Sequence, residues 1–142
     1  MSERHSEWPG LRRAAYHEAA HAVVAEALGM RVARARIGLV PVLPGVPFAT
    51  GGGVSFENDH ASPIVALAVA YAAAVAMQEG FFVDDLLGDV VEVTAAGIIL
   101  DAMGERGESR EEVEERARAA AAAILRERWD AVRSLAEALL RS

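Results

Sequence analysis

Two histidines and a glutamate in one short stretch are the side chains whose types and spacing could do chemistry. His17, Glu18 and His21 form the pattern H-E-x-x-H. On a helix, residues four apart lie one above the other on the same face, so both imidazoles can reach one metal ion while the glutamate projects beside them. This arrangement is typical of zinc hydrolases.

These residue types suit a hydrolytic zinc centre. A catalytic Zn²⁺ is held by three protein ligands and keeps a fourth position for water. The ion lowers the pKa of that water from about 15.7 towards about 7, and a nearby carboxylate can take the proton as the water attacks a carbonyl. We therefore predict one zinc ion per chain, with His17 and His21 as ligands and Glu18 as the general base. A structural alternative, in which both histidines are helix residues satisfied by hydrogen bonds, stays open.

The composition favours one domain that is mainly helical with a small sheet. The chain has 142 residues, of which 53% are hydrophobic and 6% aromatic, and this is enough to bury a sizeable core. The net charge of −7, with both signs mixed along the chain, argues against nucleic-acid binding. No lysine occurs, which excludes a P-loop nucleotide site. We predict a single domain over residues 1–142, with residues 1–10 as a flexible arm.

The absence of cysteine excludes disulfides, thiolate zinc sites and cysteine nucleophiles. The first ten residues are polar and contain no apolar segment of the kind found in secretory signals. We therefore expect a cytoplasmic protein.

The H-E-x-x-H pattern falls within a predicted helix from about residue 11 to residue 28, which Gly29 should close. On that helix the two histidines share a core-facing stripe with Val24. Alternation over residues 31–40, with arginines at alternate positions, predicts a strand, and the glycine-rich residues 51–56 predict a second. The glycine-rich edge is either a place for strand addition by an extended substrate or a plain hairpin connection.

Three further helices are expected. Ser62 as N-cap and Pro63 at the first helical position begin an alanine-rich helix that reaches about residue 80. Its apolar part is shorter than a membrane requires, so we predict a buried helix and no membrane span. Another helix is expected over residues 89–103. A capping-box pattern at Ser109 opens a long tail that should break near Trp129 into two packed helices.

Both ends of the sequence match the motifs of one family. Residues Tyr16 to Val24 fit the pattern Y-H-E-A-G-H-A-[LV]-V, with Ala20 in place of the glycine, and residues 124–140 fit I-L-x-x-x-R-D-x-L-x-x-L-A-E-A-L-L. The chain thus resembles the zinc metallopeptidase domain of FtsH, the AAA-linked membrane protease. The two segments bracket nearly the whole chain. The resemblance implies a zincin-like fold and metalloendopeptidase activity.

The resemblance also implies the third zinc ligand. In the family this ligand is the aspartate of N-D-[IL]-x-x-A-T at the start of a helix, and residues 88–94 resemble that pattern with Gly88 and Val93 in place of its Asn and Ala. Asp89 would then complete the site with the two histidines. The family's preceding pattern, G-R-x-A-E-E, is matched only faintly by residues 74–79, where a glutamine replaces the first glutamate.

Other candidates for the third ligand lie nearby in the sequence. The segment Asn58-Asp59-His60 also has the sequence N-D, followed by a histidine. They precede the alanine-rich helix, however, whereas the aspartate of the family follows it. Asp84 and Asp85 are weaker candidates because their surroundings suggest an exposed turn.

FtsH proteins couple the peptidase to an ATPase motor and membrane helices, and this sequence contains neither. The resemblance therefore implies an ATP-independent zinc metallopeptidase that acts on peptides or unfolded proteins, with a homo-oligomer left open. Two alternatives remain: a catalytically quiet peptidase-like module that binds peptides or regulates another protein, and a purely structural zinc site.

Overall fold

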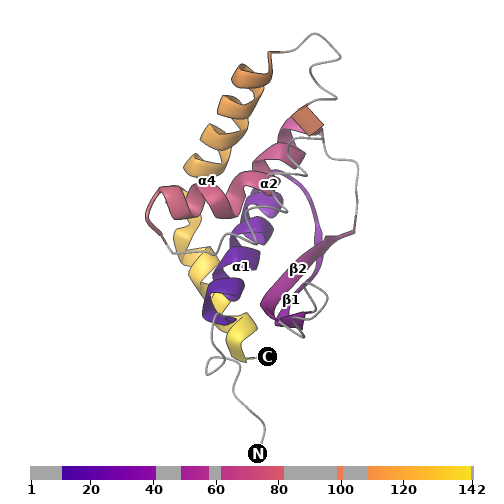
Figure 1. The fold of residues 1–142 in the computed structure, drawn as a ribbon, viewed down its shortest axis with the longest axis vertical. Helices are drawn as coiled ribbons and strands as arrows, with labels where there is room; N and C mark the ends of the chain where they lie inside the picture. Colours follow the sequence, from indigo (N-terminus) through magenta and orange to yellow (C-terminus); the bar gives the residue numbers. More distant parts are fainter. Residues whose placement is uncertain (1–10, 41–48, 58–61, 82–98, 101–108, 142) are drawn as a thin grey trace, which may run out of the picture.

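Three helices and a two-stranded antiparallel sheet make up the part of the chain that the structure describes. The computed structural model describes residues 11–40, 49–57, 62–81, 99–100 and 109–141. The elements are, in order, α1 (Leu11–Ala27), β1 (Val32–Val40), β2 (Ala49–Phe56), α2 (Pro63–Gln78) and α4 (Arg110–Arg141). The prediction of a mainly helical protein with a small sheet is confirmed. Figure 1 shows α1 between the sheet and α4, while α2 contacts both α1 and α4.

Helix α1 ends where the sequence predicts. Gly29 adopts a φ of +92°, and its backbone N–H donates to the carbonyl of Glu26 at 3.1 Å. The N–H of Met30 reaches back to the carbonyl of Ala25 at 2.9 Å, so carbonyls of the last turn are satisfied. A Cβ built on Gly29 would meet nothing within 4 Å. Glycine is therefore required at this position by the backbone conformation and not by lack of space.

The two predicted strands pair antiparallel, with Val40 opposite Ala49 and Val32 opposite Phe56. A register shift lies near the start of β1, and β2 begins two residues before the predicted limit. Side chains on one face of the sheet, including Ile37 and Phe56, pack against the helical core. The predicted loop over residues 41–47 lies outside the described residues.

Helix α2 begins with the predicted cap. The hydroxyl of Ser62 accepts a hydrogen bond from the N–H of Val65 at 3.4 Å, and Pro63 occupies the first turn. The helix is rich in buried alanines, and Leu67 is fully buried. The prediction of a buried helix is confirmed, and no helix in the described part of the chain has the length and apolar character needed to span a membrane.

Helix α4 is one continuous element with a break. The hydroxyl of Ser109 accepts from the N–H of Glu112 at 3.5 Å, as the capping pattern predicts. Arg128 departs from helical geometry, with φ −116° and ψ 22°, which confirms the break predicted near Trp129. Before the break, Arg118 and Arg126 contact residues at the end of α2, and Leu125 is fully buried. Of the helix predicted over residues 89–103, only residues 99–100 are described; they are helical, and Leu100 is buried in the core.

Candidate metal centre

The three predicted site residues that the structure describes lie inside the molecule. His17, Glu18 and His21 are 8%, 6% and 6% exposed, and they are the buried polar side chains among the described residues. Helix α1 is buried around most of its circumference, because α2, α4 and both strands all contact it. The sequence predicted one core-facing stripe, and this was too narrow: Glu18, beside that stripe, is also buried. A buried polar group must be hydrogen-bonded or coordinate a metal, so this cluster has a specific role.

The two imidazoles converge. Nε2 of His17 lies 3.1 Å from Nε2 of His21, and the ring centroids are 4.8 Å apart at an interplanar angle of 65°. Two nitrogens bound to one tetrahedral zinc at about 2.0–2.1 Å would lie about 3.3–3.4 Å apart. The observed separation differs from that value by only a few tenths of an ångström. The donor set and its spacing therefore fit a zinc ion after a small adjustment of the side chains.

Helix α2 fixes the orientation of one of these rings. Nδ1 of His21 lies 2.6 Å from the backbone carbonyl oxygen of Val69. Because a carbonyl oxygen can only accept, Nδ1 carries the proton and donates it. Nε2 is then left with its lone pair pointing towards His17, which is the form of imidazole that binds metals. Sequence analysis missed Val69 because the contact is made by a main-chain atom, for which the side chain gives no signal.

Glu18 completes the cluster. One ligand atom from each of His17, Glu18 and His21 can be chosen so that all three lie within 4.8 Å of one another. Since the two imidazole nitrogens are 3.1 Å apart, the separations near that limit involve the Glu18 carboxylate. A carboxylate at this range can contact a water molecule held beside the histidines, which is the position that a general base needs.

Ala20, which directly precedes His21, departs from the FtsH pattern but fits within the fold. Ala20 replaces the glycine of that pattern, and its side chain is fully buried within the hydrophobic core. Its methyl group fills space among the packed helices. The substitution thus belongs to the core and leaves the histidine pair intact.

Aromatic side chains hold the adjoining turn of α1 against the other helices. Tyr16 stacks on Trp129 at 5.9 Å, and Phe81 stacks on the same indole at 4.3 Å. The Tyr16 hydroxyl donates to Glu137 at 3.2 Å, and Arg12 forms an ion pair with the same carboxylate. Burial, and then the negative charge of Glu137, raise the pKa of Tyr16. Sequence analysis did not connect these residues, which are far apart along the chain.

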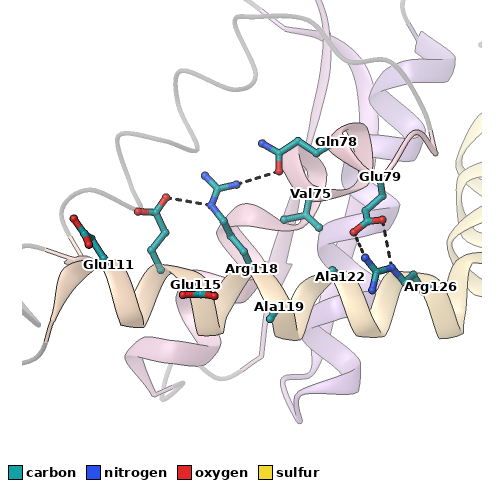
Figure 2. A pocket seen from close by; sticks show the side chains of 10 residues that line it. Val75, Gln78, Glu79, Glu111, Glu115, Arg118, Ala119, Ala122 and Arg126 are labelled. Carbon is teal, nitrogen blue, oxygen red and sulfur yellow. Dashed lines mark hydrogen bonds and ion pairs between the residues drawn. The ribbon is translucent and has the colours of Figure 1, made fainter.

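The end of α2 faces α4. Arg118 donates to Gln78 at 3.4 Å and to Glu114 at 3.1 Å, and Arg126 forms an ion pair with Glu79 (Figure 2). Gln78 and Glu79 are the residues that correspond to the two glutamates of the family's G-R-x-A-E-E pattern. In this chain they help to attach α2 to α4. Glu114 and Arg118 stand four residues apart on α4, the spacing at which opposite charges on a helix can pair.

A groove of about 540 Å³ lies along the same contact. Its walls come from α2 and α4, so it is separate from the histidine pair on α1. The lining residues are Val75, Gln78, Glu79, Glu111, Glu114, Glu115, Arg118, Ala119, Ala122 and Arg126. Arg118 and Arg126 are already paired with acidic or amide groups of the same groove.

The candidates for the third ligand, Asp89, Asp59, His60, Asp84 and Asp85, all lie outside the described residues. Asp89 therefore stays a prediction. The structure brings together His17, Glu18 and His21. The chain matches no protein-family model and no curated protein. The assignment of the site consequently rests on its motif and on the geometry described above.

Proposed function

We propose that this protein is a zinc metallopeptidase that works without ATP. The observation that carries the proposal is the convergence of two buried imidazole nitrogens, 3.1 Å apart, beside a buried carboxylate. His17 and His21 would hold Zn²⁺, and Asp89, taken from the resemblance to the FtsH peptidase, would be the third ligand. We also propose that the fold is zincin-like.

When bound at His17 and His21, Zn²⁺ would supply an acidified water molecule and would polarise the carbonyl of the scissile bond. Glu18 accepts the proton of the attacking water and then donates it to the leaving amine. His21 is kept in the metal-binding tautomer by the carbonyl of Val69. The buried position of Glu18 limits competition from bulk solvent, so its interaction with a reacting group is stronger than it would be at the surface.

The substrates we propose are peptides and unfolded or flexible polypeptide segments. These 142 residues contain no lysine, which a P-loop needs, and the proposal therefore assigns no ATP-driven unfolding to this domain. Cleavage should therefore depend on how easily a substrate presents an extended backbone.

The first experiment measures zinc content by plasma emission spectrometry on tag-free protein. We expect about one zinc per chain in the wild type, a loss of zinc in His21→Ala and Asp89→Ala, and retention in the matched control Asp59→Ala. Absence of zinc from the wild type after reconstitution would overturn the proposal. It would leave a hydrogen-bonded histidine pair, in which Nε2–H of His17 donates to Nε2 of His21.

The second experiment separates hydrolysis from binding. Glu18→Gln keeps the size of the side chain and removes its basicity, so zinc should be retained while cleavage of an unfolded protein substrate falls roughly 10²- to 10⁴-fold. Equal peptide binding without cleavage in both proteins would instead identify a quiet peptide-binding module. Unfolding on chelation, with no cleavage by the zinc-loaded protein, would identify a structural zinc site.

A further inference from the structure

The outer face of the sheet carries two exposed arginines. Arg34 and Arg36 stand at alternate positions of β1, and both are exposed. Between and after them, Ala35 and Ile37 pack against the core. Because successive side chains of a strand point to opposite faces, the two guanidinium groups project together on the face away from the helices.

These arginines have no acidic partner in the part of the chain that the structure describes. Across the ladder, Arg34 faces Ser55 and Arg36 faces Gly53, and neither of these residues carries a charge. The nearest acidic residue along β2 is Glu57, which pairs with Arg31 at 3.8 Å. Among the described residues, no acidic neighbour neutralises the positive charge of this face.

No described residue covers the same face at Gly38. Gly38 continues the alternate positions of the two arginines, and a Cβ built on it would meet nothing within 4 Å. A ligand can thus approach β1 from this side without displacing described parts of the protein.

The spacing of the charges indicates what such a ligand is. Two residues of a strand span about 6.6–6.8 Å, and alternate residues of any extended polypeptide have the same repeat. Guanidinium groups bind carboxylates through two parallel hydrogen bonds. The chain as a whole has a net charge of −7, which disfavours a polyanion carrying a charge on every nucleotide. A short segment with two carboxylates avoids most of that repulsion.

We propose that Arg34 and Arg36 form a binding surface for extended polypeptide segments with Asp or Glu at alternate positions. This surface does not depend on zinc or on catalysis. Combined with the function proposed above, it would direct acidic, extended segments to the peptidase.

The test is fluorescence anisotropy at low salt with a labelled peptide that carries glutamates at alternate positions. The full-length Glu18→Gln chain prevents cleavage, and the wild-type chain in chelator provides a second preparation with the same expectation. Arg34→Ala/Arg36→Ala should weaken binding about tenfold, in line with two exposed charge pairs. The control Arg116→Ala/Arg141→Ala removes the same charge from exposed positions of α4 and should leave binding unchanged.

Two comparisons make the proposal specific. A peptide of the same composition with its glutamates three residues apart should bind less tightly than the alternating peptide. An oligothymidylate of similar length should also bind less tightly. The proposal is overturned if the wild-type chain binds neither peptide, if both double variants bind equally, or if the oligonucleotide is preferred. Matching thermal melts would show that the variants are folded.

Discussion

The aromatic stack beside the histidine pair allows a quantitative test of how the helices are held together. Trp129 lies at the break in α4 and contacts Tyr16 of α1 and Phe81 after α2 through stacked rings. Each such pair is worth about 0.5–1.5 kcal/mol beyond the area that it buries. The indole is only half-buried, so the loss of burial is smaller than for a core residue. We expect Trp129→Ala to lower the free energy of unfolding by about 3 kcal/mol.

This loss translates into a shift of the melting temperature. Unfolding entropies of about 2.1 cal/mol/K per residue give about 0.3 kcal/mol/K for a chain of 142 residues. Trp129→Ala should therefore melt about 10 °C below the wild type. Trp129→Phe retains a ring between the two neighbours and should cost about 1 kcal/mol.

The assay is urea denaturation followed by circular dichroism, because the Trp129 variants lose the tryptophan that would report on this contact by fluorescence. The reasoning is refuted if Trp129→Ala costs less than about 1 kcal/mol, or if the phenylalanine variant is as unstable as the alanine variant. Either result would mean that the stack does not couple α1, α2 and α4.

Two other predictions concern the backbone and the response to alkaline pH. Gly29→Ala should lower the free energy of unfolding by about 1 kcal/mol, measured by urea denaturation, because φ at this position is +92°. The control Gly38→Ala has an ordinary φ and no described atom near the added methyl group, so it should cost less than half as much. Equal losses in the two variants would contradict the argument. Burial, followed by the charge of Glu114, raises the pKa of Tyr71, so the folded chain keeps this proton after the unfolded chain has lost it. The contribution of Tyr71 to stability should be complete below about pH 10 and should be lost as pH rises through the pKa of the folded state. The midpoint of urea denaturation, measured from pH 8 to 11, should therefore fall less steeply for Tyr71→Phe than for the wild type.

The local elements could be predicted because their signals are local. Ser62 and Pro63 mark the start of α2, and Gly29 marks the end of α1 through a conformation that few other residues adopt. A break in α4 was predicted near Trp129, and the structure has it at the adjacent Arg128. Each of these features depends on a few adjacent residues, and so the sequence alone was sufficient.

The surroundings of the site could not be predicted in the same way. A helical wheel assumes one buried stripe, but α1 is contacted by two helices and both strands, and Glu18 is buried as well. The carbonyl of Val69 orients His21 through the relative placement of α1 and α2, which no side-chain pattern encodes. The spacing of His17 and His21 was enough to predict that both histidines lie on one face of a helix. The orientation of their rings depends on tertiary structure.

The break at Arg128 divides the contacts of α4 between the two helices that form the candidate centre. Before the break, Arg118 and Arg126 attach α4 to the end of α2; after it, Glu137 holds Tyr16 and Arg12 of α1. Helix α4 therefore contacts both α1, which carries His21, and α2, which carries Val69. The hydrogen bond of 2.6 Å between these two residues tolerates little change in their separation. Helix α4, which carries none of His17, Glu18 and His21, thus joins the two helices whose relative placement orients the ring of His21.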